Sequence, residues 1–175
     1  MHHHCIKAAY KRLTKHSHEC MVDQLWNNLL RIYFSESVFL IAVQDQPALS
    51  SLDRMDVSLS YVELSSLEPK TLCVVENKRV EFEGQNAVWA DAVVQLTDYM
   101  NTNRDARGQE DEDIYGIVTV GRYSRFYVLK AGKLELRDLP HTGGGYFEFK
   151  KDEMAIDKIL RDMKADIEGR DSFGY

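Results

Sequence analysis

Residues 56–62 read DVSLSYV, and residues 71–78 read TLCVVENK. In the first stretch apolar and polar side chains alternate strictly, which is the pattern of a half-buried β-strand. The second stretch is apolar on both faces until Glu76, so it predicts a buried strand. The turn-forming composition of residues 65–70 favours a short connection, and we therefore expect the two strands to pair antiparallel.

Charged side chains gather at one end of this predicted pair. Asp56 opens the first strand, whereas Glu76 and Lys78 close the second. In an antiparallel hairpin the start of the first strand lies beside the end of the second, so we expect Asp56 opposite residues 76–79. Glu76 and Lys78 are two residues apart and should share one face of the sheet.

The acid-x-lysine triplet at residues 76–78 is not specific by itself. The same pattern occurs at Glu68-Pro69-Lys70, Glu148-Phe149-Lys150 and Asp162-Met163-Lys164. Only the 76–78 triplet ends a predicted buried strand and has an acid on the partner strand. The alternative is a structural ion pair in which Lys78 neutralises Glu76. An acid at the end of a strand buried on both faces favours a functional site, because an unpaired buried charge is costly.

These residue types suit phosphodiester hydrolysis. That reaction needs a hard cation that activates a water molecule and neutralises charge on the phosphate. Mg²⁺ prefers oxygen ligands, commonly one or two carboxylates, and Mn²⁺ can substitute for it. We expect Asp56 and Glu76 to be metal ligands, with the backbone carbonyl of Asn77 as a further one. Lys78 is expected to orient the attacking water or to stabilise the developing oxyanion.

The rest of the chain predicts an α/β fold with a mixed sheet and flanking helices. Apolar spacing and turn residues predict a helix at 17–33 with Ser17 as its N-cap, a buried strand at 38–43, a helix at 85–101, a loop at 103–113, a strand at 114–120, a hairpin over 125–136 and a helix at 151–167. The order is α-β-β-β-α-β, then a hairpin and a helix. We expect one domain over residues 17–175, preceded by a segment, 1–16, that begins with a histidine run interpreted as the remnant of a purification tag.

The predicted helix at 85–101 carries two further candidates. Gln95 and Tyr99 are four residues apart and therefore lie on one helix face. Because this helix must pack back on the sheet, they are expected to reach the carboxylate site or a bound phosphate. The alternative is that both only flank the apolar stripe of the helix.

Composition limits the choice of function class. The formal net charge of −6 counts against a high-affinity, non-specific nucleic-acid binder, although a local basic patch can coexist with an acidic remainder. No apolar run is long enough to span a bilayer, so no membrane association is expected. Three cysteines without a zinc-binding spacing favour a reducing compartment, cytoplasmic or nuclear.

Taken together, the motifs resemble the PD-(D/E)XK nuclease superfamily. Asp56 corresponds to its first acid, with Met55 in place of the proline, and residues 76–78 correspond to its E-x-K element. Residues 95–99, QLTDY, resemble the Q-x-x-x-Y motif of the RecB-like branch. Residues 115–129 are loosely similar to fungal and Crinkler-type effector relatives.

The resemblance implies a restriction-endonuclease-like αβββαβ core and a Mg²⁺-dependent endo- or exonuclease. Its expected partner is nucleic acid, DNA more than RNA, and a protein partner or homodimer is the further possibility. It also implies that an acid on or after the first helix joins the site, for which Glu19, Asp23 and Glu36 are candidates. The alternative is a catalytically inactive form of the same fold that binds nucleic acid or protein.

Overall fold

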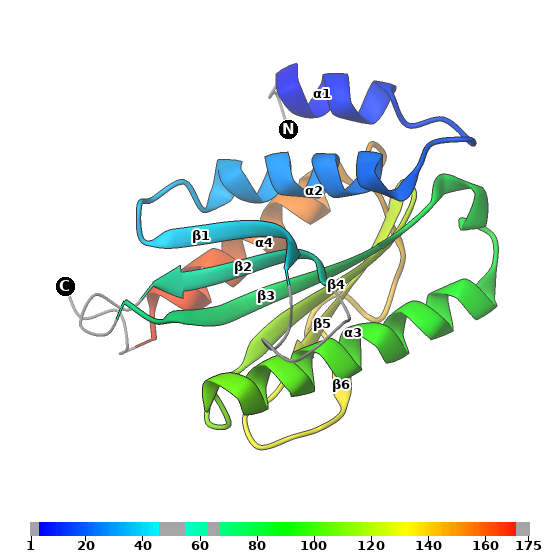
Figure 1. The fold of residues 1–175 in the computed structure, drawn as a ribbon. Helices are drawn as coiled ribbons and strands as arrows, with labels where there is room; N and C mark the ends of the chain where they lie inside the picture. Colours follow the sequence, from blue (N-terminus) through cyan, green and yellow to red (C-terminus); the bar gives the residue numbers. More distant parts are fainter. Residues whose placement is uncertain (1–3, 46–54, 63–66, 171–175) are drawn as a thin grey trace.

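The computed structural model describes residues 4–45, 55–62 and 67–170. One seven-stranded mixed sheet carries helices on both faces (Figure 1). Its elements are α1 (His4–Lys11), α2 (Glu19–Tyr33), β1 (Phe39–Asp45), β2 (Met55–Val62), β3 (Pro69–Lys78), the 3₁₀ turn η1 (Val80–Phe82), α3 (Asn86–Arg107), β4 (Ile114–Val120), β5 (Tyr123–Leu129), β6 (Leu136–Asp138), β7 (Phe147–Glu148) and α4 (Glu153–Glu168). Met1, His2 and His3 of the expected tag, and Ser65 and Ser66 of the expected turn, lie outside the described residues.

The strands follow the order β1-β2-β3-β4-β5-β6, and β7 pairs with the other end of β5. The predicted antiparallel pairing of β2 with β3 is confirmed, whereas β3 and β4 are parallel. A parallel pair needs a crossover, and α3 supplies it. The order α-β-β-β-α-β is observed from α2 to β4, and the hairpin and helix follow as β5–β6 and α4.

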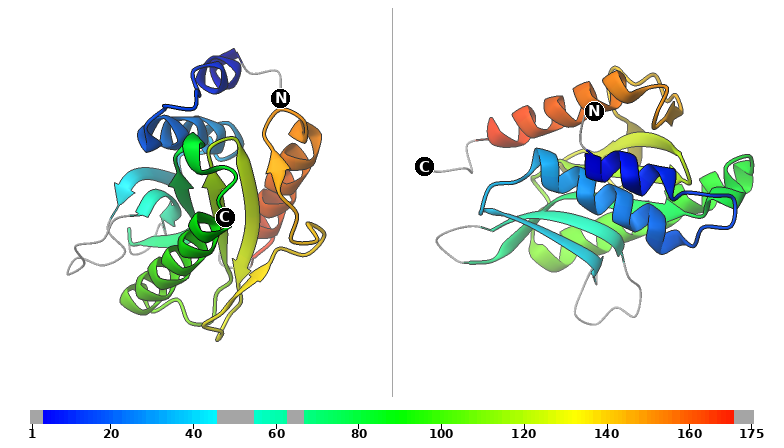
Figure 2. Two further views of the ribbon diagram at one scale, coloured as in Figure 1. Left: turned by 90° about the vertical axis from the view of Figure 1, so that its right-hand side faces the viewer. Right: turned by 90° about the horizontal axis from the view of Figure 1, so that it is seen from above.

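The helices divide the apolar core into two layers. One layer lies between the sheet and α2 and α4, and the other between the sheet and α3 (Figures 1 and 2). Strand residues therefore point alternately to the two layers. Val57 and Val75 face the α2 side, and Val74 faces the α3 side. Both faces of the central strands are thus closed to solvent, which makes β3 a rigid support for the residues at its end.

Several predicted details are wrong. The polar face of β2 is not solvated, since Ser58 and Ser60 are buried. The strand expected to be buried, β1, is the edge of the described sheet and leaves Leu40 and Val43 exposed. The apolar run in β1 is hydrophobic on both faces, and nothing in it distinguishes an edge from a centre.

The helix ends differ as well. Helix α2 begins at Glu19 with His18 as its N-cap, while Ser17 instead closes the preceding turn by accepting a hydrogen bond from the Thr14 N–H. Helix α3 runs into the segment expected to be a loop and ends at Gly108, whose φ of 62° is the left-handed C-cap conformation. Arg104 holds this last turn, because its guanidinium donates to three backbone carbonyls.

The N-terminal segment forms α1, which lies on α2 (Figure 1). Ile6 is buried in the same core as α2 and α4. The Tyr10 ring stacks on Phe149, and its hydroxyl donates to Glu148 at 2.5 Å. Helix α1 is therefore part of the packed structure. None of the helices in the described ranges is long and apolar enough to cross a bilayer.

Candidate functional site

The end of the β2–β3 pair at Asp56 and Glu76 is also where α2 and α3 begin (Figure 1, right). Val57 pairs with Val75, so one step outward along both strands brings Asp56 level with Glu76. Residues directly opposite each other in a sheet share a face, and the two acids therefore lie at one end and on one side of the pair. Both are almost fully buried, with exposed fractions of 6% and 2%.

Asp56 is fixed by two hydrogen bonds. Its Oδ2 accepts from the backbone N–H of Asn77 at 2.7 Å, and its Oδ1 accepts from the Gln44 side chain at 3.1 Å. Gln44 belongs to β1 and has a φ of 57°, a conformation rare for a residue other than glycine. Strained backbone of this kind clusters at functional sites. The sequence offered no signal for Gln44, because an edge-strand glutamine is unremarkable until its backbone conformation is known.

Glu76 and Lys78 form an ion pair on the side of the sheet that faces α3. The Lys78 ammonium contacts Glu76 Oε1 and also donates to Gln95 Oε1 at 2.8 Å. Glu76 Oε2 is buried and has no hydrogen-bond partner among the described residues. The structure thus brings Gln95 to the predicted site. Tyr99, one turn further along α3, packs its ring against the core on that side.

The structure distinguishes among the three acids expected near the first helix. Asp23 of α2 is buried, and its Oδ1 accepts a hydrogen bond from the Asn77 side chain at 3.0 Å. Glu19, one turn earlier, lies close enough for its charge to raise the pKa of Asp23, Asp56 and Glu76. Glu36 instead forms an ion pair with Lys164 on the surface. Asp23 and Glu19 therefore border the site, and Glu36 does not.

A cavity of about 430 Å³ opens beside these carboxylates. It lies between the first half of α2 and the end of β1, and Glu19, Asp23 and Gln44 are among the residues that line it. A ligand in this cavity would meet Glu19 and Asp23 directly. Asp56 does not line the cavity and is linked to its wall through Gln44 and Asn77.

Burial dominates the electrostatics of the cluster. Burial raises the pKa of Asp23 to about 7, of Asp56 to about 6 and of Glu76 to about 8. The negative charge of Asp56 adds to the shift of Asp23 and Glu76. Burial opposes the charge of Lys78, but Glu76 beside it outweighs this effect and raises the lysine pKa. One ammonium thus faces several crowded carboxylates, and the cluster must hold protons or a cation near neutral pH.

This imbalance predicts a pH-dependent stability in metal-free solution. The folded state binds protons that the unfolded chain releases near pH 4, so the free energy of unfolding should fall as the pH rises from about 5 to 8. The slope is about 1.4 kcal/mol per pH unit for each excess proton. Urea unfolding in EDTA at several pH values measures it. Glu76→Gln should flatten the slope, and a slope unchanged by this substitution would contradict the shift assigned to Glu76.

The donor set fits a hard cation. The side chains offer carboxylate oxygens, one of which, Glu76 Oε2, is buried without a partner. Within the described residues no three histidine, cysteine, aspartate or glutamate side chains converge closely enough to enclose a metal ion. That excludes a dedicated cage of three such ligands there, but Mg²⁺ commonly takes one or two carboxylates and keeps several waters. Asp56 and Glu76, together with the Asn77 carbonyl, would hold such an ion.

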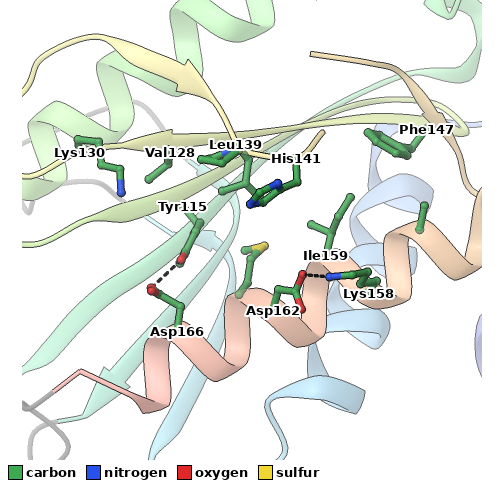
Figure 3. A pocket seen from close by; sticks show the side chains of 13 residues that line it. Tyr115, Val128, Lys130, Leu139, His141, Phe147, Lys158, Ile159, Asp162 and Asp166 are labelled. Atoms are coloured by element: carbon green, nitrogen blue, oxygen red, sulfur yellow. Dashed lines mark hydrogen bonds and ion pairs between the residues drawn. The ribbon is translucent and has the colours of Figure 1, made fainter. Parts of the chain in front are cut away.

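A second cavity, of about 390 Å³, lies away from this cluster (Figure 3). It is enclosed by β4, β5, α4 and the segment after β6. Tyr115, at the start of β4, donates to Asp166 of α4 at 2.6 Å on one side of it. Tyr115 pairs with Cys73, five residues before Lys78 on the neighbouring strand. This cavity is therefore separate from the predicted site.

No family model and no curated protein sequence matches the chain. The functional reading of the site therefore depends on its geometry and chemistry.

Proposed function

We propose that the chain is a metal-dependent nuclease that hydrolyses phosphodiester bonds, in DNA more readily than in RNA. The observation that carries this proposal is the set of contacts joining Asp56, Asn77, Glu76 and Lys78 at one end of the β2–β3 pair. The resemblance to the PD-(D/E)XK superfamily, with its restriction-endonuclease-like core, is part of the proposal, and the element order from α2 to β4 supports it.

Each residue has a distinct part in the proposed reaction. Asp56 and Glu76 bind the ion, and the hydrogen bonds from Gln44 and Asn77 fix the orientation of Asp56. Mg²⁺ would lower the pKa of a bound water and polarise the phosphate. Lys78 stands at the surface end of the buried pair, where its ammonium can orient the attacking water or stabilise negative charge on the phosphate. Gln95 holds the ammonium in place.

The direct test is cleavage by the purified protein. Linear and circular DNA and a single-stranded RNA are each incubated with Mg²⁺ or Mn²⁺. The products show which substrate is cut and whether cutting is internal. Excess EDTA should stop cleavage, and restored Mg²⁺ should recover it. A protein that cuts equally well in EDTA, or cuts none of the three substrates with either ion, contradicts the proposal.

A second candidate is a non-catalytic module that keeps this fold and binds nucleic acid or protein. The acidic net charge of −6 favours the protein-binding form of this module, because a protein that gathers nucleic acid by itself, nuclease or not, usually carries positive surface. Binding of DNA and metal without cleavage of any substrate would identify this second candidate.

A further inference from the structure

A basic cleft lies at the same end of the sheet as the acidic cluster. It has a volume of about 510 Å³ and is formed by α1, by Arg122 of the β4–β5 turn and by the segment leading into α4. In the left view of Figure 2, which looks onto this end, α1 (blue) and the segment before α4 (orange) lie next to each other. Its rim carries four cations and one carboxylate, namely Lys7, Lys11, Arg122, Lys150 and Glu153.

Three of these cations are available to a ligand. Arg122 is held by Glu83, to which its guanidinium donates two hydrogen bonds. The ammonium groups of Lys7, Lys11 and Lys150 have no carboxylate partner among the residues that the structure describes, in contrast to the paired Lys70 and Lys130. A local excess of unpaired positive charge in a chain of net charge −6 is a binding surface for anions.

The floor of the cleft is apolar. Ile6 and Leu13 line it from below, and Phe149 closes it under the ring of Tyr10. The carboxylate of Glu148 accepts hydrogen bonds from the Tyr10 hydroxyl and from the backbone N–H groups of Lys150 and Lys151, and it keeps its negative charge beside the cleft. An apolar floor with a cationic rim suits a chain in which flat apolar groups alternate with phosphates.

One wall of the cleft, the β4–β5 turn, is bonded to the backbone at the end of β3. Val120 pairs with Lys78, and the next residue, Gly121, donates its N–H to the Lys78 carbonyl at 2.9 Å. Arg122 follows immediately in the same two-residue turn between β4 and β5. Gly121 has a φ of 59°, and a Cβ there would lie 2.7 Å from Val80 Cα, so the turn can pack this closely only with glycine.

We propose that this cleft binds one strand of nucleic acid, with Lys7, Lys11 and Lys150 contacting successive phosphates. A volume of about 510 Å³ accommodates a ligand of nucleotide size and not a duplex. A strand held there lies on the α2 side of the sheet, and it would have to pass around the end of β3 to reach Lys78 on the α3 side. The direction of the strand toward the carboxylates rests on the proposed nuclease function. The assignment of the cleft itself is tested by binding alone.

The test measures binding of a single-stranded oligothymidylate by fluorescence anisotropy in EDTA. The probe carries a 5′-fluorescein label and is about twelve nucleotides long, which is within the site size of single-strand binding folds. Lys7→Ala/Lys11→Ala/Lys150→Ala should weaken binding by at least about tenfold at low salt. The variant should also reduce the slope of the logarithm of the binding constant against the logarithm of the salt concentration by about 2, because each of the three lost phosphate contacts contributes about 0.7. Alanine is compatible with helix α1, so the variant should fold, and its circular dichroism and Tm confirm this.

The matched control is Lys133→Ala/Arg137→Ala/Lys158→Ala, which removes the same charge from exposed positions outside the cleft. It should change the affinity by no more than about threefold. Equal losses in both triple variants would overturn the assignment, as would a wild type that does not bind the oligonucleotide. Equal binding of a duplex of the same length would overturn the single-strand assignment. Loss of binding to phosphatidylserine vesicles, with unchanged oligonucleotide binding, would identify the cleft as a lipid site and overturn it as well.

Failure of this proposal is distinct from failure of the proposed function. Asp56→Ala/Glu76→Ala removes the expected metal ligands and should still bind the oligonucleotide through the cleft. If binding depends on the cleft lysines but no substrate is cleaved, the proposed cleft is supported and the proposed nuclease function is contradicted. If the triple variant of the cleft lysines cleaves and binds as wild type does, the proposed nuclease function is supported and the proposed cleft is contradicted.

Discussion

Lys78→Ala should lower the cleavage rate by about 10²–10³-fold, the usual effect of removing one group that stabilises charge in a transition state. The affinity for Mg²⁺ should be unchanged or somewhat tighter, because the lysine is not a ligand and its positive charge opposes a cation beside Glu76. Single-turnover cleavage and a calorimetric Mg²⁺ titration separate the two effects. Gln95→Ala should cost less than Lys78→Ala, since Gln95 acts by holding the ammonium. Tyr99→Phe should lower the cleavage rate by still less.

The matched control for this prediction lies on the same strand. Lys70, at the other end of β3, forms an ion pair with Glu112 at 3.1 Å. Lys70→Ala removes an equal charge and also breaks a lysine–glutamate pair, although a more exposed one, and it should leave the cleavage rate within about twofold. A Lys78→Ala sample that cuts as fast as wild type would mean that a contaminating nuclease, or a different site, produces the activity.

Asp56→Ala/Glu76→Ala should abolish both cleavage and the stabilisation produced by metal. At a Mg²⁺ concentration of 100 times Kd, binding to the folded state alone stabilises by about 2.7 kcal/mol. For a chain of this size that is a rise in Tm of roughly 5–10 °C. The double variant should show no rise. Two effects on its own Tm in EDTA oppose each other, because the variant loses two crowded, buried acids but leaves the Lys78 ammonium without its carboxylate partner. The metal-dependent shift, and not the starting Tm, is therefore the measurement that decides.

A control for general electrostatic effects is Glu110→Ala/Asp111→Ala, which removes two exposed carboxylates from the loop after α3. This variant should keep the full metal-dependent shift. If the Asp56/Glu76 double variant also keeps it, the metal binds elsewhere, and the N-terminal histidines are then the first place to examine. Mn²⁺ should act like Mg²⁺ in both variants, since both ions accept the same oxygen ligands.

The sequence was most informative where local pattern and burial agree. Alternation in β2 and the apolar run in β3 predict a hairpin, and in a hairpin Asp56 must meet the end of β3. That reasoning needs no knowledge of distant parts of the chain. The apolar stripe of α2, including Trp26 and Leu29, was predictable for the same reason and is fully buried.

What could not be predicted depends on how separate elements are placed relative to one another. Glu19, Asp23 and Glu36 are equivalent in sequence, and only the rotation of α2 over the sheet brings Asp23 to Asn77. Gln44 reaches Asp56 through a left-handed backbone conformation that no composition rule signals. Met154, an apolar residue in the first turn of α4, is 87% exposed, whereas Ile156 two residues later is fully buried.

The crossover between β3 and β4 affects when the carboxylates are brought together during folding. The acids at or beside the site, Glu19, Asp23, Asp56 and Glu76, all precede α3 in the chain. The second edge of β3, however, is paired only by β4, which follows α3. Pairing of parallel strands across a long crossover closes late in folding, since the loop entropy must be overcome before the contacts form. During synthesis a nascent chain that has emerged only as far as β3 would present that strand as an open edge. The carboxylates should therefore remain loosely arranged until the second half of the domain has left the ribosome.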